Sequence, residues 1–537
     1  MVRLEWLRDS QKKQGGEIWS HPRRLHKSSL SEARVAAAST FMSLSVDDAF
    51  LQHIISADQM SVPVPGVENA VDVEPIERDD LSDMVDRSWD ELFGMHRAER
   101  EDFQIKSLRR RLEELLPKLS SLRVQVEDTA VSRIGRLEDV VPLLFHDSVY
   151  KSYPISLIEK NQFDRLTKWL SGYTTVDLTC VDVSNYQGVD RWIDTLDAQT
   201  ALRVVHTTGT SGKLSFFPRS TVEIRSFFKS LLKVHEGFGS EPGVRLGDGQ
   251  TRLIVVNPVP RYGRQIRHRC FPLMQKYVTP APDQLYALDY EVSADLVSLS
   301  GRIRIAQAKG ELSKIKLSDS QRAAMVKYLA DLETRPADAA SFYQRIADEL
   351  RGKRVLASGF TNLLQEAART GLERGMRNIF APGSIGMTGG GNKDGALLPN
   401  WLDLVREFTG IRKWAMNYGM SEMISMMPMG DEGWYHVPPY VIPFLLDPVS
   451  GAPLPRTGVV TGRLAFYDLL AQTNWGGIIS GDKVTIDWDG PSPSGRKAPR
   501  IRSDITRYTA QITGEDKVTC AATADQTDAA LQALLAR

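Results

Sequence analysis

Cysteine is scarce in this chain of 537 residues, which contains only three: Cys180, Cys270 and Cys520. They lie far apart and show no spacing typical of a metal site, so a disulfide framework is not expected. A reducing compartment suits such a sequence, and we expect a cytoplasmic protein. Long apolar runs are also lacking. The nearest is 437–449, whose prolines and short length exclude a membrane span, and the first residues lack the apolar stretch of a signal peptide.

An excess of charge of either sign is lacking too. Lys and Arg together number 67, and so do Asp and Glu, which gives a formal net charge of zero. A balanced chain argues against broad electrostatic binding to nucleic acid or to an anionic membrane. We therefore expect no nucleic-acid partner. The length is sufficient for about two or three domains with substantial cores.

The pattern of apolar and charged residues changes near residue 140. Residues 1–140 are rich in charge and poor in strand signals, which predicts a mostly helical N-terminal region with a flexible, proline-containing part near 61–75. In residues 141–488, strand-like runs alternate with helical ones, which predicts an α/β core. Two buried strands are expected at 251–259 and 353–360, and two amphipathic helices at 318–333 and 339–353.

A linker follows the core. Residues 489–500 are rich in proline, glycine and charge, which is typical of a hinge. The division that we expect is therefore a helical region at 1–140, a large α/β core at 141–488, and a hinge with a short α+β piece at 489–537.

A loop of small hydroxyl residues and glycines follows an apolar run at 204–220, and one lysine comes directly after it. It is not a Walker loop, because Thr207 stands where the first glycine belongs and Leu214 where a Ser or Thr belongs. Backbone N–H groups, hydroxyls and a lysine can still surround a triphosphate; a solvent-exposed turn is the alternative. The candidate residues are Thr207, Thr208, Gly209, Thr210, Ser211, Gly212 and Lys213.

This loop resembles the [ST]-[ST]-G-[ST]-[ST]-G-x-P-K motif of the adenylate-forming acyl ligase superfamily, with Lys213-Leu214 in place of the usual Pro-Lys. "MTGGGNKDG" (387–395) and "NYGMSEM" (417–423) follow in the order of that superfamily, and each is open to a plain structural interpretation as a turn or a buried Tyr. The resemblance implies that Tyr418 stacks on adenine, Ser421 touches a phosphate and Glu422 holds Mg²⁺. It also places Gly389, Gly390, Gly391, Asn417 and Gly419 around the nucleotide.

Two further positions come from the same resemblance. Asp482, in a stretch similar to the superfamily's "TGD" motif, would accept the ribose hydroxyls. Arg496, in the hinge, would contact the ribose or the α-phosphate, with Arg500 and Arg502 as competitors. Lys517 is the candidate for the catalytic lysine that superfamily members carry on a longer C-terminal domain, which the resemblance leads us to expect in truncated form here.

Within this superfamily, the sequence pattern of the chain resembles that of the branch with phenylacetate–CoA ligase-like enzymes and acyl-protein synthetases. Its members have a large core of stacked α/β subdomains with a small β-rich part. The resemblance implies that a carboxylic acid reacts with ATP to form an acyl-adenylate, and that a thiol, most often coenzyme A, then takes the acyl group. Partners would be the acid and either coenzyme A or an acyl-carrier or reductase protein.

Two alternatives stay open. Cys520 can be a covalent acyl acceptor, as in acyl-protein synthetases, although a small buried cysteine is the more common role. The chain can also be a non-catalytic adenylate-binding scaffold, although a scaffold has no need of Glu422. A cluster of arginines at 261–269 can meet the phosphates of coenzyme A or a substrate carboxylate; a loop paired with acidic neighbours is the expectation that we favour.

Overall fold

The structure is a computed structural model that describes residues 84–183, 185–207, 213–238, 246, 251–390, 397–490 and 492–508. The chain divides into two units, Pro65–Leu531 and a second formed by Met1–Val64 with Gln532–Arg537. Every described residue belongs to the first unit. The predicted flexible part at 61–75 lies outside the described residues.

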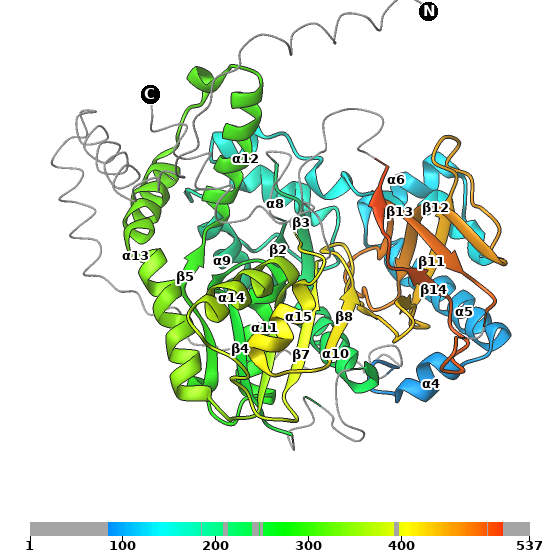
Figure 1. The fold of residues 1–537 in the computed structure, drawn as a ribbon. Helices are drawn as coiled ribbons and strands as arrows, with labels where there is room; N and C mark the ends of the chain where they lie inside the picture. Colours follow the sequence, from blue (N-terminus) through cyan, green and yellow to red (C-terminus); the bar gives the residue numbers. More distant parts are fainter. Residues whose placement is uncertain are drawn as a thin grey trace, which may run out of the picture. The chain divides into compact units, whose positions relative to one another are not determined.

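A six-stranded sheet forms the centre of the α/β part, with strand order β5-β4-β6-β7-β8-β9. Its first five strands in this order are parallel, and β9 pairs antiparallel to β8. Such strands are buried on both faces and read as continuous apolar runs. The strands are β4 (Ile254–Gly263), β5 (Leu285–Val292), β6 (Val355–Phe360), β7 (Ile385–Gly389), β8 (Trp414–Tyr418) and β9 (Met427–Pro428) (Figure 1).

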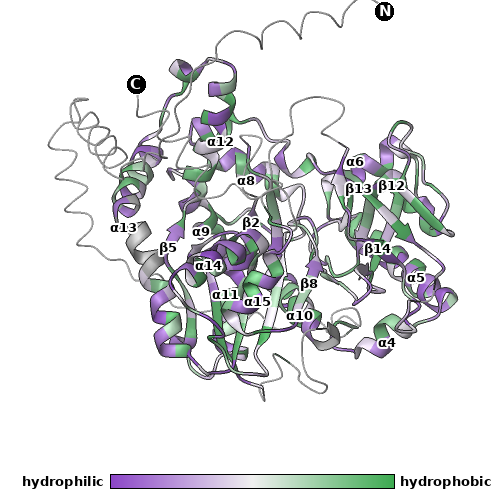
Figure 2. Cartoon of the chain, viewed as in Figure 1, coloured by the Kyte–Doolittle hydropathy of each residue, from purple (hydrophilic) through white to green (hydrophobic). Residues whose placement is uncertain are grey.

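Helices cover both faces of this sheet. Alternate residues of one strand face opposite sides, so Val255 packs in the core that holds residues of α10 (Thr221–Phe238) and α11 (Ile266–Tyr277). Its neighbour Val256 packs in a different core. That second core is built with residues of α13 (Asp319–Leu350), α14 (Thr361–Glu373) and α15 (Trp401–Thr409). Figure 2 shows the apolar strands enclosed by helices of mixed hydropathy.

The predicted α/β class is confirmed, and so are the strands expected at 251–259 and 353–360, which are β4 and β6. The prediction of two helices at 318–333 and 339–353 was wrong, because α13 is one helix of 32 residues that includes Pro336. A proline removes one backbone hydrogen bond at a cost of about 3 kcal/mol. Strong helix formers on both sides of the proline let the helix continue through it.

A second sheet of seven strands has β10-β14-β13-β12-β11 as its main order, and its pairs are antiparallel except for β1 with β13. The two-residue strands β1 and β15 both pair with β13. Residues 500–507, which the sequence places in a C-terminal piece after a hinge, thus join this sheet. The strands are β1 (Phe145–His146), β10 (Trp434–His436), β11 (Val441–Leu446), β12 (Val459–Asp468), β13 (Gly477–Asp487), β14 (Arg500–Arg502) and β15 (Thr506–Arg507).

The described part of the N-terminal region is helical and packs on this antiparallel sheet. Gln104 Nε2 donates to the Pro439 carbonyl at 2.8 Å, and Leu108 lies in the same core as strands β11 to β13. The boundaries at residues 140 and 488 stay predictions. The elements are α4 (Trp89–Gly94), α5 (Arg97–Leu115), α6 (Ser120–Thr129), η2 (Leu137–Leu143) and η3 (Val149–Lys151).

A two-stranded hairpin of β2 (Leu202–His206) and β3 (Phe216–Ser220) follows the N-terminal helices and precedes the parallel sheet in the sequence. The candidate phosphate loop connects its two strands. The hairpin shares a third core with the helices that precede it. The remaining elements are α7 (Ser156–Glu159), α8 (Phe163–Ser171), α9 (Val189–Gln199), α12 (Ala294–Ala308), η4 (Pro282–Gln284) and η5 (Leu312–Lys314).

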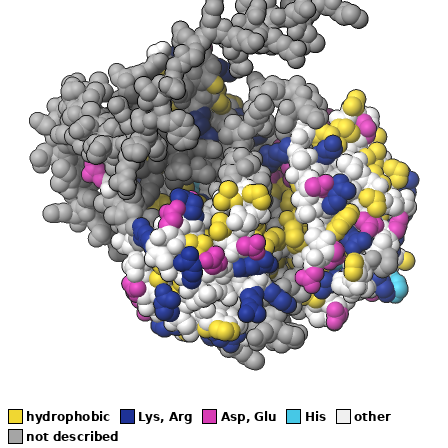
Figure 3. All heavy atoms as spheres, viewed as in Figure 1, with side chains coloured by type: hydrophobic (Ala, Val, Ile, Leu, Met, Phe, Trp, Pro, Cys, Tyr) yellow, Lys and Arg dark blue, Asp and Glu magenta, His cyan; other side chains and the backbone are white. Residues whose placement is uncertain are grey.

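Charges are interspersed on the face drawn in Figure 3, in keeping with the zero net charge. On α14, for example, Arg369 pairs with Glu366 and Glu373 at 2.7 Å. Across the described residues, no helix has both the length and the apolar composition for crossing a membrane.

Candidate nucleotide site

The glycine-rich turn predicted to lie against adenine begins where strand β7 ends. Gly389 is paired in register with Asn417 of β8, and a Cβ on Gly389 would lie 3.0 Å from the Asn417 Oδ1. Gly390 has a φ of +102°, and a Cβ there would lie 3.2 Å from Cδ1 of Phe360. Both positions therefore favour glycine for steric reasons. They lie at the carboxyl edge of a parallel sheet, where ligands of α/β proteins commonly bind.

Tyr418 and Asp482 are in direct contact, although they are 64 positions apart. The Tyr418 hydroxyl donates a hydrogen bond of 2.6 Å to Oδ2 of Asp482. Arg507 Nε donates to Oδ1 of the same carboxylate at 3.1 Å, because strand pairing sets Arg507 opposite Asp482. Burial, together with the charge of Asp482, raises the pKa of Tyr418 well above its usual value. Tyr418 therefore stays protonated as a donor.

Glu422 lies in the same electrostatic neighbourhood. Burial is the largest cause of its raised pKa, the carboxylates of Asp147 and Asp482 raise it further, and Arg507 acts in the opposite direction. A cation beside Glu422 would favour the ionised form, so the carboxylate fits a divalent metal. No group of three or more metal-ligating side chains occurs among the described residues. Mg²⁺ commonly takes one or two carboxylates and completes its coordination with phosphate and water oxygens, so a single carboxylate such as Glu422 is a ligand of the kind that it uses.

The turn that carries Glu422 is held from two sides. Arg219 of β3 is buried, and its Nη2 donates to the carbonyls of Ser421 at 3.0 Å and Glu422 at 2.8 Å. Asp468, at the end of β12, accepts from the N–H groups of Ile424 and Ser425 at 2.8 Å each. The hairpin that bears the phosphate loop is thus bonded to the turn that bears Glu422.

Both ends of the phosphate loop are fixed by this hairpin. The N–H of Thr207 donates to the Ser215 carbonyl at 3.2 Å, and its Oγ1 accepts from the Ser215 N–H at 3.1 Å. Lys213 Nζ lies 4.6 Å from the ring centroid of Tyr153. Partial burial, with a contribution from the charge of Lys151, lowers the pKa of Lys213. The loop residues between these ends lie outside the described residues.

Arg496, the hinge arginine predicted to contact the ribose or the α-phosphate, lies against Trp89 and Ser494. The Arg496 guanidinium lies 5.0 Å from the ring centroid of Trp89, and Nη1 donates to Ser494 Oγ at 3.3 Å. Its competitors have carboxylate partners of their own, Asp487 for Arg500 and Asp504 for Arg502. The role of Arg496 stays a prediction, and Arg507 is the arginine bonded to Asp482.

Several predicted positions cannot be placed, and their roles stay predictions. They lie outside the described residues: Thr208, Gly209, Thr210, Ser211, Gly212, Gly391, Lys517 and Cys520.

Sequence reasoning missed three residues that hold the site together: Arg219, Asp468 and Arg507. One feature of the sequence could have indicated Asp468, since an acidic residue at the end of an apolar strand is unusual. No feature of the sequence could have indicated Arg219 or Arg507, because their contacts depend on the tertiary structure.

Two recesses formed by described residues lie apart from this site. One is an apolar cavity of about 30 Å³ whose lining includes Val256, Tyr343 and Trp414. The other is an open groove of about 860 Å³ lined by residues such as Arg133 and Pro453. Neither lining includes a predicted site residue.

Comparison with known proteins gives matches among solved structures. No family model and no curated protein matches the chain. An open conformation of 2-hydroxyisobutyryl-CoA ligase in complex with 2-HIB-AMP and CoA aligns with 14% identity, over 78% of this chain and 72% of that chain, with a TM-score of 0.45.

Two other matches are more limited. ATP-bound MatB from Rhodopseudomonas palustris aligns with 15% identity over 55% of this chain, with a TM-score of 0.28, and the match spans 47% of MatB. The luciferase-like enzyme of the Zophobas morio mealworm aligns with 9% identity over 56% of this chain and 57% of that chain, with a TM-score of 0.28. At these values the function has to be inferred from the chain's own residues.

Proposed function

We propose that the chain is an AMP-forming ligase that activates a carboxylic acid with ATP and passes the acyl group to a thiol. One observation carries the proposal: Tyr418 and Asp482, from separate motifs, meet at 2.6 Å, with Glu422 in the same electrostatic neighbourhood. The motif resemblance assigns these three residues to adenine, ribose and Mg²⁺. A single adenylate site requires them to lie together.

Nucleotide binding follows from this arrangement. Adenine lies against the glycine turn at Gly389 and Gly390 and against the ring of Tyr418. Asp482 accepts the ribose hydroxyls, and the hydrogen bonds from Tyr418 and Arg507 hold its carboxylate in place beforehand. A carboxylate fixed before binding loses less conformational entropy when the ribose arrives.

In the first step, an oxygen of the acid's carboxylate forms a bond to the α-phosphorus of ATP, and the bond from that phosphorus to the bridging oxygen breaks. Pyrophosphate carries away the electron pair. Two anions must approach each other, so the step needs neutralisation of charge. Mg²⁺ bound at Glu422 would supply much of it. Lys213 and the N–H groups of the phosphate loop supply the rest, and Arg219 keeps the Glu422 turn in position.

In the second step, a thiol sulfur attacks the acyl carbonyl carbon, and AMP leaves with the electron pair of the acyl–phosphate bond. We assign coenzyme A as the thiol. Of the two described cysteines, Cys270 is buried, which raises its pKa to about 12 and disfavours the thiolate, and Cys180 is exposed. Lys517 and Arg496 keep their proposed roles in adenylation.

The test is a screen of carboxylic acids for ATP-dependent release of pyrophosphate, followed by mass spectrometry of products formed with coenzyme A or with a carrier protein. We expect at least one acid to release pyrophosphate and to give an acyl-CoA. Transfer only to the protein's own Cys520, lost in Cys520→Ser with pyrophosphate release kept, would replace coenzyme A by an acyl-enzyme. Binding of ATP without any acid-dependent release would mark a scaffold.

A further inference from the structure

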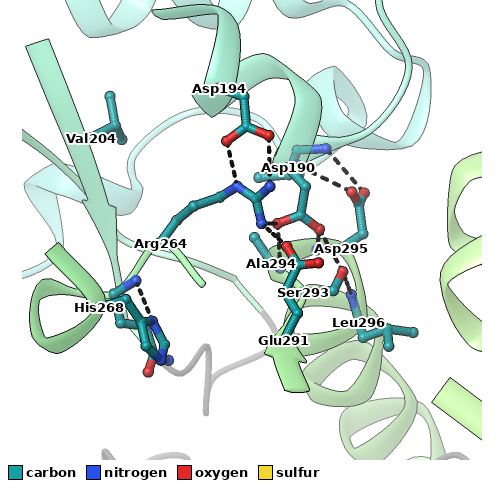
Figure 4. A network of polar contacts seen from close by, with 12 residues as sticks. Asp190, Asp194, Val204, Arg264, His268, Glu291, Ser293, Ala294, Asp295 and Leu296 are labelled. Carbon is teal, nitrogen blue, oxygen red and sulfur yellow. Dashed lines mark hydrogen bonds and ion pairs between the residues drawn. The ribbon is translucent and has the colours of Figure 1, made fainter. Parts of the chain in front are cut away.

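The arginines at 261–269 do not share one role, and Arg264 is clearly structural. Its guanidinium forms ion pairs with Asp190 at 2.7 Å, Asp194 at 2.6 Å and Glu291 at 2.5 Å. Figure 4 shows its side chain pointing into this group of carboxylates, next to the starts of α9 and α12. Arg264 therefore has no capacity left for a ligand.

Two more arginines of the cluster are also engaged. Arg269 pairs with Asp197 and donates to the Val204 carbonyl at 2.8 Å. Arg261 donates to the Leu285 carbonyl. The expected acidic neighbours are found for Arg264 and Arg269, and a backbone carbonyl accepts from Arg261. The expected loop was wrong for most of this stretch, because β4 extends to Gly263 and α11 begins at Ile266.

Like Arg261, Arg267 has no carboxylate partner among the described residues, and unlike Arg261 it donates to no backbone carbonyl there. Its Nε donates to Nε2 of His268 at 3.3 Å, and its guanidinium lies 5.1 Å from the ring centroid of Phe360. Burial lowers the pKa of His268 to about 2, so the imidazole is neutral and offers no counter-charge. Burial lowers the pKa of Arg267 to about 10, which leaves it charged at pH 7. A largely buried cation without a counter-ion is costly unless a ligand completes it.

The position of Arg267 links it to the nucleotide site. Phe360, under its guanidinium, is the last residue of β6, and its ring edge is the nearest atom to the Cβ position of Gly390. The ring of Phe360 therefore contacts both Arg267 and the turn that is proposed to lie against adenine. The acid has to lie beside the nucleotide for its carboxylate to reach the α-phosphorus.

Two buried polar atoms on the same side of the sheet also lack partners. Asn257 Oδ1 and Ser358 Oγ have no hydrogen-bond partner among the described residues. Strand alternation puts them on the face of Val255 and Leu356, whose core also holds residues of α11, the helix of Arg267. Buried polar atoms are nearly always satisfied in complete structures. A polar ligand between these strands and α11 would satisfy them.

We infer that Arg267 binds a second carboxylate of the acid substrate, so that the chain activates dicarboxylic acids. The inference rests on the proposed ligase function. One guanidinium with no carboxylate partner among the described residues matches one carboxylate, which its two terminal nitrogens can hold with two parallel hydrogen bonds. Coenzyme A carries several phosphate charges, and the neighbouring Arg264 and Arg269 are already paired with carboxylates. The first carboxylate stays free to attack ATP.

The experiment compares acids of equal chain length, succinate with butyrate and glutarate with pentanoate, by pyrophosphate release from the full chain. We expect the dicarboxylate to have at least about a 10-fold higher kcat/KM in each pair, because a site built for a polar group rejects an analogue that lacks it. Arg267→Met should abolish this preference, and Arg267→Lys should retain part of it. Arg191→Met is the control, since that exposed arginine also lies over a ring, 4.8 Å from the centroid of Tyr186.

Calorimetric measurement of dicarboxylate binding without ATP distinguishes failure of the second-carboxylate site from failure of the ligase function. Equal kcat/KM for both members of each pair, unchanged in Arg267→Met, would overturn the inference and leave the ligase function standing. Dicarboxylate binding that is lost in Arg267→Met, with no pyrophosphate release from any acid, would overturn the ligase function and retain the anion site.

Discussion

Asp482 is the residue on which the proposed nucleotide site depends most directly. One of its oxygens accepts from Tyr418 and the other from Arg507, so the carboxylate is oriented before any ligand arrives. The motif in the sequence could predict Tyr418 and Asp482, because their types and order are typical of adenylate-forming ligases. Arg507 could not be predicted, since its contact comes from the pairing of a two-residue strand.

Replacing Asp482 by Ala should raise the KM for ATP by at least about 10-fold, because the ribose loses charge-assisted hydrogen bonds. Steady-state pyrophosphate release at varied ATP concentration measures this KM. Asp504→Ala is the matched control, as Asp504 is exposed and pairs with Arg502. Equal KM values for the two variants would contradict the ribose assignment.

Arg219 acts through the Glu422 turn rather than on substrate. Arg219→Met should lower kcat by about 10-fold and raise the Mg²⁺ concentration needed for half-maximal rate, because two carbonyls lose their donor. A magnesium titration of the rate provides the measurement. Arg203→Met is the control, since Arg203 is paired in register with Arg219 on the neighbouring strand. A lower stability with an unchanged Mg²⁺ dependence would show a purely structural role.

At the scale of elements, α9 and α12 cap each other's N-termini. Asp190 of α9 accepts from the N–H of Ala294, and Asp295 of α12 accepts from the N–H groups of Val189 and Asp190 (Figure 4). Carboxylates are favourable at helix N-termini. Burial, and then the nearby Asp190 charge, raises the pKa of Asp295 to about 7.

This raised pKa makes stability depend on pH. Between the unfolded-state pKa of Asp, about 3.9, and about 7, native Asp295 holds a proton that the unfolded chain has released. The free energy of unfolding therefore falls as pH rises through this window. Thermal unfolding from pH 5 to pH 8 should show the fall, reduced in Asp295→Asn and kept in the exposed control Asp289→Asn. A slope identical in both variants would contradict the assignment.

Element prediction from the sequence succeeded where one signal dominated. The apolar runs that became β4 and β6 could be recognised because strands of a parallel sheet are buried on both faces. The break expected between two helices did not occur at Pro336, because propensity on both sides outweighed one lost hydrogen bond. Strands as short as β1 and β15 carry no local signal, since their pairing with β13 alone defines them.

At the scale of the whole described molecule, one core joins α4 and α5 to both the parallel and the antiparallel sheet. Trp89 Nε1, for example, donates to the Lys233 carbonyl of α10 at 2.9 Å. The sequence predicts helices here but not this attachment, because apolar periodicity shows that a helix has a buried face and not which surface covers it.

Leu108→Ala should therefore destabilise the folded chain by about 2–5 kcal/mol, because Leu108 is fully buried in the shared core. Urea unfolding followed by tryptophan fluorescence and by circular dichroism would measure it, with Val124→Ala on the exposed side of α6 as the control. Coincident transitions are expected. A separate early transition for the helices would contradict a common core.

The central claim is that Tyr418, Glu422 and Asp482 surround one adenylate. The most direct measurement is a crystal structure with a non-hydrolysable acyl-adenylate analogue and Mg²⁺. The account predicts the adenine beside the turn at Gly389 and the ring of Tyr418, and both ribose hydroxyls on Asp482. An analogue bound elsewhere, with the Tyr418–Asp482 hydrogen bond unchanged and no contact to either residue, would contradict it.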